Sequence, residues 1–327
     1  MSRAIEGAEV NLGGEIPQPF FSVIMPAYNS ELYLAAAIDS VLEQEFAEWE
    51  LLIVDDGSTD RTLAIALQYA ENNRRIRVFT QENAGTAAAR NRALEQASAP
   101  WALMLDSDDM LLPECMGTYE RFLRDHPGYA FYSCNGLILY PSGRTHKAHR
   151  ERWRRRAWSA NLGDCMSGSP VMLPGSLVAT EIVLALGGFA EGVYNEDHEL
   201  WIRLLASGAS HLYCPDVLVV HRQVPTSKTK SYARTAASSL AVVSALGAER
   251  ACALGVYREW LSGIRAYESA AIVGEAQEMV AEGRQSAAVQ RLWRDRKSVI
   301  WNSRNLARLS AMLLTPRLYV KWLERSK

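Results

Sequence analysis

Residues 50–62 read ELLIVDDGSTDRT, an apolar run that is followed at once by an acidic turn. A similar order occurs at residues 20–30, where FFSVIM precedes the turn PAYNS, which has no acid, and at residues 101–109, where WALML precedes the acidic turn DSDD. Short runs that are apolar throughout predict strands buried on both faces of a sheet. The decisive feature of the chain is therefore a strand whose carboxyl end carries acids.

Helical periodicity fills the segments between these strands. Residues 34–42 and 62–70 each carry apolar side chains on one face, and residues 86–97 form an Ala-rich helix. Residues 76–79 and 212–220 are interpreted as two more strands. Strands that alternate with helices predict an α/β fold, a Rossmann-like sandwich with a mostly parallel central sheet.

Ligands of such sheets bind beyond the carboxyl ends of the strands, so residues 26–29, 55–58 and 106–109 should meet at one edge. Clustered acids repel one another unless a divalent cation or hydrogen-bond donors compensate them. Asp106 and Asp108 have a spacing that lets two carboxylates reach one Mg²⁺ or Mn²⁺ together with a diphosphate. A capped turn is the alternative for this pair, and a helix N-cap is the alternative for Asp55 and Asp56.

Composition limits the function classes. The chain has 327 residues, with 35 Lys and Arg against 37 Asp and Glu, so its formal net charge of −2 does not favour a polyanion binder or a nucleic-acid partner. No uncharged run reaches the ~18 residues of a membrane span, and residues 1–19 are interpreted as a loose leader without signal-peptide features. Five widely spaced cysteines favour reduced thiols and a cytoplasmic location.

Six blocks of the sequence resemble the family-2 glycosyltransferases of the GT-A fold, in that family's order. They are FSVIMPAYNS, LLIVDDGSTD, QENAGTAAARNRAL, LMLDSDDMLLP, GGFAEGVYNEDHELWIRL and HRQVPTSKT. The resemblance implies a catalytic domain at residues 20–229, with a nucleotide-binding half at 20–110 and an acceptor half at 111–229. A helical basic region at 230–327 would follow.

The same resemblance implies an activity. A sugar would pass with inversion from a nucleoside-diphosphate sugar, a UDP-sugar by resemblance, to a hydroxyl of a glycan or lipid-linked acceptor. The reaction would need a divalent cation, Mn²⁺ or Mg²⁺, and would serve bacterial-type cell-surface glycan or glycolipid synthesis.

The resemblance also assigns residues to the donor nucleotide. Tyr28 would stack on the base within a turn that includes Pro26 and Ala27. Asp56 would accept a hydrogen bond from the edge of the base, and Gly85 would let the backbone approach the nucleotide closely. For Tyr28, an ordinary packed aromatic of a turn is the alternative.

Four further residues would complete the donor site. Arg90 would lie near the diphosphate or ribose, with a helix-surface charge as the alternative. Asp106 and Ser107 would contact the ribose side of the donor, and Asp108 would bind the metal. Asp109 matches an additional acid of the family with a supporting role.

Inverting displacement needs a carboxylate that takes the proton of the acceptor hydroxyl. The family places this base in an E-D pair that opens a helix, which is Glu196-Asp197 here, and we assign the role to Asp197. Glu196 and Arg203 would position the acceptor or brace the base. An acid stabilised by the helix dipole is the alternative for Asp197, and both interpretations can hold together.

The block HRQVPTSKT departs from the family pattern. His221 precedes Arg222, and Val224 stands where a histidine would be expected, which puts a histidine metal ligand in doubt. Arg222 and Ser227 match the pattern and would contact the diphosphate. His221 is kept as a candidate metal ligand.

Two basic segments have no assigned partner. Residues 144–156 carry seven Lys or Arg and one Glu, which favours a solvated face or, alternatively, an anionic acceptor. Residues 285–327 carry a net charge of +8, whereas the rest of the chain carries −10. The last helix, which begins at Thr315-Pro316, could contact an anionic membrane at its inner face, or pack on the protein or a second subunit as a homo-oligomer.

Two other functions compete with glycosyl transfer. A nucleotidyltransferase would carry a Gly-rich basic loop after the first strand, and this chain has PAYNS there instead. A catalytically silent subunit that binds nucleotide or glycan would not need both Asp108 and Asp197.

Overall fold

The computed structural model describes residues 18–147, 157–168, 171–224 and 231–299. The chain divides into two compact units. Unit 1 contains Met1–Asn161, Pro170–Gly192 and Leu200–Pro225, and unit 2 contains Leu162–Ser169, Val193–Glu199 and Thr226–Lys327. This division differs from a boundary at residue 229, because two short segments before that residue cluster with the C-terminal helices.

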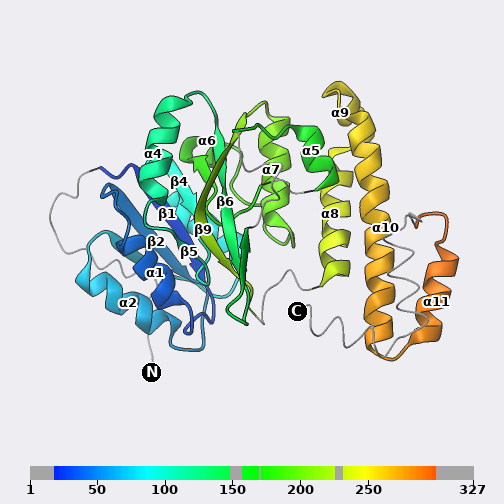
Figure 1. Ribbon diagram of the computed structural model, residues 1–327, viewed down its shortest axis with the longest axis horizontal. Helices are drawn as coiled ribbons and strands as arrows, with labels where there is room; N and C mark the ends of the chain where they lie inside the picture. The colour runs from blue at the N-terminus through cyan, green and yellow to red at the C-terminus, as the bar shows by residue number, and fades with distance from the viewer. Residues whose placement is uncertain (1–17, 148–156, 169–170, 225–230, 300–327) are drawn as a thin grey trace. The chain divides into compact units, whose positions relative to one another are not determined.

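Unit 1 begins with parallel strands in the spatial order β3-β2-β1-β4. These strands are β1 (Phe21–Ala27), β2 (Trp49–Asp55), β3 (Ile76–Thr80) and β4 (Trp101–Met104). Every residue of β1 and β2 is buried, which explains why both read as continuous apolar runs. Their register pairs Ala27 with Asp55, so the carboxyl ends of the two strands lie side by side (Figure 1).

Three helices connect these strands as the periodicity predicts. They are α1 (Leu34–Leu42), α2 (Thr62–Asn72) and α3 (Thr86–Glu95). The buried side chains Leu34, Ile38 and Val41 of α1 join those of β1 and β2 in one core cluster. Packing of these faces on the sheet holds the strand ends, and the loops after them, in fixed positions.

The remaining part of the sheet is mixed. Strand β4 continues to β8 and β6, both by antiparallel pairing, then to β9 in parallel and to β5 in antiparallel fashion. The elements of this part are β5 (Met110–Leu111), α4 (Cys115–Asp125), β6 (Phe131–Leu139), β7 (Thr145–Lys147), β8 (Leu177–Ala179), α6 (Thr180–Ala185), α7 (Glu196–Ala206) and β9 (His211–Arg222). Among the described residues, nine strands form one sheet.

Unit 2 is helical. Its elements are α5 (Leu162–Ser167), the first residues of α7, α8 (Tyr232–Leu246), α9 (Ala248–Ala253), α10 (Tyr257–Ala281) and α11 (Gln285–Arg294). Helices α8 and α10 run side by side (Figure 1), and Gly274 of α10 permits this, because a Cβ there would lie 2.8 Å from the Cα of Ala233. Gly263 of α10 likewise admits the backbone of Met166 in α5.

Both the predicted fold class and the predicted thiols agree with this structure. The architecture is α/β with a mostly parallel sheet and C-terminal helices, which confirms the expected class. The five cysteines form no disulfide, and four of them are buried. Within the described ranges, no helix combines the length and the apolar character that a bilayer crossing requires.

Candidate active site

The loops that follow β1, β2 and β4 are joined by hydrogen bonds at the carboxyl edge of the sheet. The backbone N–H of Asp56 donates to the carbonyl of Ala27 at 2.8 Å. The hydroxyl oxygens of Ser30 and Ser107 lie 2.7 Å apart, which joins the first loop to the loop after β4. The structure thus brings together three segments that lie far apart in the sequence.

Asp56 organises the loop between β3 and α3. Its carboxylate accepts hydrogen bonds from the N–H groups of Ala84 and Gly85, each at 2.9 Å, and from the side-chain amide of Gln81 at 2.8 Å. Gly85 has a φ of +95°, a left-handed conformation that favours glycine, and a Cβ there would meet no atom of the described part of the chain within 4 Å. This leaves open space beside the Gly85 backbone.

Tyr28 is accessible in the same region, with 49% of its surface exposed. It follows Pro26 and Ala27, which form the buried end of β1. The aromatic ring therefore stands at the mouth of the sheet rather than in the core, where a flat ligand could stack on it.

Helix capping explains Asp60 of the DDGSTD turn but not Asp55 or Asp56. Asp60, rather than Asp55 or Asp56, accepts the N–H of Thr62 at the start of α2, at 2.9 Å. Asp55 is buried, and one of its carboxylate oxygens has no hydrogen-bond partner among the described residues. Asp55 and Asp56 are thus available for a role other than capping.

Arg90 is buried and pairs with Asp106. A guanidinium nitrogen of Arg90 lies 2.6 Å from the Asp106 carboxylate, and only 3% of the Arg90 side chain is exposed. The guanidinium also lies 5.2 Å from the ring centroid of Phe189, a cation–π distance. Arg90 is therefore not a solvated charge of the helix surface, and its guanidinium holds the carboxylate of Asp106.

Three acids meet beyond β4. Carboxylate oxygens of Asp106, Asp108 and Asp109 all lie within 4.8 Å of one another. Burial, followed by the negative charges of Asp109 and Asp106, raises the pKa of Asp108 to about 7. Burial also raises the pKa of Asp109. This arrangement costs electrostatic free energy unless positive charge is supplied.

Part of that positive charge comes from β9. The Nδ1 of His221 lies 3.1 Å from each carboxylate oxygen of Asp109, and the N–H of Arg222 donates to Asp109 at 2.8 Å. Burial lowers the pKa of His221, but the hydrogen bond to Asp109 and the surrounding acids outweigh it and raise the pKa to about 9. A protonated imidazole has no lone pair for a metal, so in this arrangement His221 acts as a counterion of Asp109.

Arg222 is fixed by the same acidic loop. Its Nε donates to the backbone carbonyl of Asp108 at 3.0 Å, and its guanidinium lies 5.1 Å from the ring centroid of Tyr33. The side chain is thereby held next to the acids. It could contact a diphosphate there without moving away from the loop.

The acidic cluster fits a hard divalent cation. Mg²⁺ and Mn²⁺ prefer carboxylate oxygens, and the cluster offers carboxylates whose mutual repulsion a cation would relieve. Asp109 already accepts hydrogen bonds from His221 and Arg222, and Asp106 accepts one from Arg90. Burial and then the like charges raise the pKa of Asp108, so this carboxylate gains most from a bound cation and is the residue best suited to hold the ion.

The predicted base lies in unit 2, in which Val193–Glu199 is included. Glu196 and Asp197 open α7, where the helix dipole favours carboxylates. Glu196 is buried with 7% exposed, whereas Asp197 is half-buried, and one of its carboxylate oxygens accepts the N–H of His198 at 2.7 Å. Of this pair, Asp197 is the more accessible.

Arg203 braces a turn of unit 1. Its guanidinium donates to the carbonyls of Leu186 at 2.6 Å and Gly188 at 2.7 Å. The side-chain amide of Asn91 holds the same turn, because it donates to the carbonyl of Phe189 and accepts the Phe189 N–H. The role of Asn91 was not predicted, although the residue stands inside the AAARNRAL block.

Several predicted features fall outside the described residues. These are Ser227, most of the basic segment 144–156, and the last helix of the chain. The contacts that no sequence pattern had indicated are those of Asp109 with His221 and those of Asn195 with helix α8. Both join residues that are distant in sequence, so only the topology reveals them.

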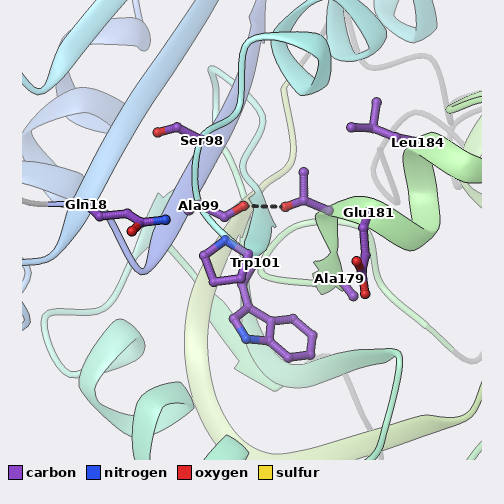
Figure 2. Close-up of a pocket in the computed structure, with 9 residues that line it drawn as sticks. Gln18, Ser98, Ala99, Trp101, Ala179, Glu181 and Leu184 are labelled. Carbon is purple, nitrogen blue, oxygen red and sulfur yellow. Dashed lines mark hydrogen bonds between the residues drawn. The ribbon is translucent and has the colours of Figure 1, made fainter.

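A pocket of about 520 Å³ opens near the amino-terminal end of β4 (Figure 2). Its lining includes Gln18, Trp101 and Glu181. Two further lining residues are joined by a hydrogen bond, which the hydroxyl of Thr180 donates to the carbonyl of Ala99 at 2.8 Å. Trp101 begins β4, whereas the acidic cluster follows the end of that strand. The pocket is therefore separate from the acidic site.

Two family models match the chain. The model described as Glycosyl transferase family 2 matches residues 22–175, and the one described as Glycosyl transferase family group 2 matches residues 101–270. The second match alone spans more than half of the chain, and together they include the loops described above.

Individual relatives match over shorter stretches. TuaG of Bacillus subtilis, whose name assigns it to teichuronic acid biosynthesis, is 47% identical over 129 residues, which are 37% of this chain and 51% of TuaG. The UDP-Glc:alpha-D-GlcNAc-diphosphoundecaprenol beta-1,3-glucosyltransferase WfgD of Escherichia coli is 48% identical over 27% of this chain and 35% of its own length. The matches thus span about half, or less, of these relatives.

Solved structures resemble the chain over most of its length. S. aureus TarS in complex with UDP-GlcNAc superposes with a TM-score of 0.62 at 21% identity, over 93% of this chain and 89% of that chain. The mannosyltransferase PcManGT from Pyrobaculum calidifontis, in complex with GDP-Man and Mn²⁺, gives 0.59 at 18% identity, over 94% and 85%. At these identities the likeness shows a shared fold.

Proposed function

The chain belongs to glycosyl transferase family 2, and from this premise we propose that it transfers a sugar from a nucleoside-diphosphate sugar to an acceptor hydroxyl with inversion. The observation that carries the proposal is the convergence of Asp106, Asp108 and Asp109 beside the loops of Asp56 and Tyr28. The acids can hold a divalent cation that binds the diphosphate, and the exposed ring of Tyr28 can stack on the nucleobase. A binding site for a nucleoside diphosphate requires both.

The donor would lie across the carboxyl ends of β1, β2 and β4. Tyr28 offers its exposed ring to the base, and Asp56 offers carboxylate lone pairs near the open space at Gly85. Asp106, oriented by Arg90, and Ser107 face the ribose side of the donor. Solved structures of this fold are complexes with UDP, UDP-GlcNAc and GDP-Man, and a UDP-sugar is our proposal for this chain.

Asp108 would hold a divalent cation, Mn²⁺ or Mg²⁺. When bound, such an ion offsets the negative charge that develops on the leaving diphosphate. Asp109 supports this arrangement by keeping His221 and Arg222 next to the acids. Arg222, with Ser227, supplies hydrogen-bond donors to the diphosphate. His221 serves as a counterion while it is protonated, and direct ligation would require loss of that proton.

Asp197 would act as the general base. Its carboxylate takes the proton of the acceptor hydroxyl while the acceptor oxygen forms a bond to the anomeric carbon. The bond between that carbon and the diphosphate oxygen breaks, and the nucleoside diphosphate leaves with the electron pair. Attack from the face opposite the leaving group inverts the configuration, and Glu196 would help to position the acceptor.

The acceptor is proposed from the relatives and from charge. TuaG and WfgD carry names that assign them to teichuronic acid synthesis and to a diphosphoundecaprenol acceptor, so a cell-surface glycan or a lipid-linked sugar is our proposal. An anionic acceptor would suit the basic residues 144–156, and the basic residues 285–327 would contact an anionic membrane. Cytoplasmic action at the inner face of the membrane would follow.

A donor panel tests the proposed function. The full chain is incubated with UDP-, GDP- and dTDP-sugars in the presence of Mn²⁺, and release of the nucleoside diphosphate is measured with and without a chelator. We expect release from one nucleotide class, a UDP-sugar, and loss of that release with chelator. A protein that binds UDP but releases it from no donor would instead be a silent binding subunit.

A further inference from the structure

The segment that carries Asp197 is fastened to helix α8 by Asn195. The Asn195 side-chain amide nitrogen donates to the carbonyl of Thr235 at 3.0 Å and to the hydroxyl of Ser239 at 2.8 Å. The Asn195 backbone N–H donates to the hydroxyl of Ser238 at 3.2 Å. One residue thus makes hydrogen bonds to three positions on one face of α8, and Ser239 is 4% exposed.

A second attachment follows Asp197. The Nε2 of His198 lies 2.7 Å from the backbone carbonyl of Cys165 in α5, and since a carbonyl only accepts, this nitrogen carries the proton. The His198 ring, which is 2% exposed, also packs near Tyr267 of α10, with the centroids 6.0 Å apart. Asp197 therefore stands between two residues that are both held by helices of unit 2.

The attachments fix the direction of the intervening carboxylates. Asn195 begins α7, because its carbonyl accepts the N–H of Glu199 at 3.1 Å. Its Nδ2 is nevertheless directed to α8. With residues 195 and 198 tied down, Glu196 is buried and Asp197 remains half-exposed, with its carboxylate held by the N–H of His198. A loop without these attachments would not keep Glu196 buried and Asp197 accessible.

We propose that Asn195 is a positioning residue for the base Asp197, and that α8, through Thr235 and Ser239, belongs to the catalytic apparatus. The inference rests on the proposed function, since it requires Asp197 to be the base. The C-terminal helices would then have a role in positioning the base, besides any contact with a membrane. A displacement of about 1 Å of a catalytic group can lower a rate about 100-fold, so loss of these hydrogen bonds should slow the chemical step.

The test compares kcat, KM and nucleotide binding. Asn195→Ala should lower kcat for release of UDP from the UDP-sugar by roughly 10- to 100-fold, with the donor KM and the calorimetric affinity for UDP unchanged. Ser239→Ala should lower kcat in the same direction, and Ser239→Thr, which keeps the hydroxyl, should restore it. Ser244→Ala, at an exposed position of the same helix, is the matched control and should retain the rate of the wild type.

A double variant separates positioning from stability. In the Asp197→Asn background, Asn195→Ala should change the residual rate by less than about threefold, because the group it positions is gone. If Asn195→Ala does not fold, kcat is measured for Asn195→Asp instead. This variant has the same shape but cannot donate to the Thr235 carbonyl, so its kcat should also fall. Folded Asn195 and Ser239 variants with the kcat of the wild type would overturn this inference alone. A fully active Asp197→Asn variant would overturn the proposed base as well.

Discussion

Asp108 shows how like charges prepare a cation site. Its carboxylate is close to those of Asp106 and Asp109, and burial together with these charges raises its pKa to about 7. Arg90 compensates Asp106, and His221 compensates Asp109. A cation would stabilise the remaining negative charge, which makes Asp108 the member of the cluster whose removal should affect metal binding most.

Asp108→Asn should weaken Mn²⁺ binding by at least about 10-fold, because the amide keeps the shape but removes the charge. Calorimetric titration of the full chain with Mn²⁺ measures the change. Asp125→Asn, at an exposed position of α4, is the matched control and should bind Mn²⁺ as the wild type does. Equal Mn²⁺ affinity of the Asp108 variant and the control would contradict the assignment.

His211 is a buried neutral histidine of unit 1. Its Nδ1 accepts the N–H of Ala160 at 3.0 Å, so the proton is on Nε2, which lies 2.8 Å from the hydroxyl of Ser133. Burial lowers the pKa of His211 from 6.5 to about 3. In the unfolded chain the residue takes up a proton near pH 6.5, whereas in the folded chain it stays neutral.

The free energy of unfolding should therefore fall as the pH drops below 6.5 towards 3. The contribution of His211 changes by up to about 1.4 kcal/mol per pH unit in this window. Urea denaturation of the wild type and of His211→Gln at pH 7.5, 6.5 and 5.5 measures it. The stability gap between the two should shrink below pH 6.5, and a gap that does not depend on pH would show that the pKa of His211 is the same in the folded and the unfolded chain.

At the scale of elements, Gly263 sets the contact between α10 and α5. A Cβ at Gly263 would lie 2.0 Å from the carbonyl oxygen of Met166, so the helices cannot stay in place around an alanine. Gly117 in α4 is a helical glycine with space, because its nearest neighbour would be a guanidinium nitrogen of Arg121 at 3.9 Å. The two positions differ in packing but share the same helix propensity.

Gly263→Ala should destabilise the protein by roughly 2 kcal/mol, since the cost of overpacking exceeds the gain in helix propensity. Gly117→Ala should be neutral or stabilising by up to about 1 kcal/mol. Differential scanning calorimetry compares the two unfolding temperatures. If Gly263→Ala were as stable as Gly117→Ala, the close approach of α5 and α10 would be refuted.

Elements with continuous apolar runs could be predicted from the sequence. The strands β1, β2 and β4 follow from such runs, and the helices between the strands follow from helical periodicity. In contrast, β6 contains Ser133, Asn135 and Gly136, which interrupt its pattern, and β5 and β8 have only two and three residues. Their pairing depends on tertiary contacts, so local propensity could not indicate it.

The same limit applies to the site. The acids after β4 could be placed at the sheet edge because parallel strands end there together. The pairing of Asp109 with His221 could not be predicted, because these residues are 112 positions apart in the sequence and meet only when β5 lies against β9. The hydrogen bonds between Asn195 and α8 are a similar case. They depend on how helices of unit 2 pack.

At the scale of the whole molecule, the net charge of −2 conceals a separation of charge. Residues 285–327 carry +8 and the rest of the chain −10. Trp293 of α11 is 70% exposed, and the guanidinium of Arg296 lies 4.9 Å from its ring centroid. Aromatic and basic side chains together are typical of surfaces that contact anionic lipids.

The basic residues 285–327 should bind the chain to vesicles that contain phosphatidylglycerol, and binding to phosphatidylcholine vesicles should be weak. Sedimentation at low and high salt measures this, and binding should weaken as salt rises because the attraction is screened. A chain that ends at Thr315 lacks four of the ten basic residues of this segment and should bind less. Binding that depends on neither lipid charge nor salt would contradict a role for the basic segment.

The whole proposal depends on a donor site that binds nucleotide and on a separate base that drives transfer. Asp197→Asn separates the two most directly, because the amide keeps its shape but cannot take a proton. We expect calorimetric affinity for UDP to remain that of the wild type, while release of UDP from the UDP-sugar falls by about 100-fold or more. A folded Asp197→Asn protein that releases UDP at the rate of the wild type would contradict the assignment.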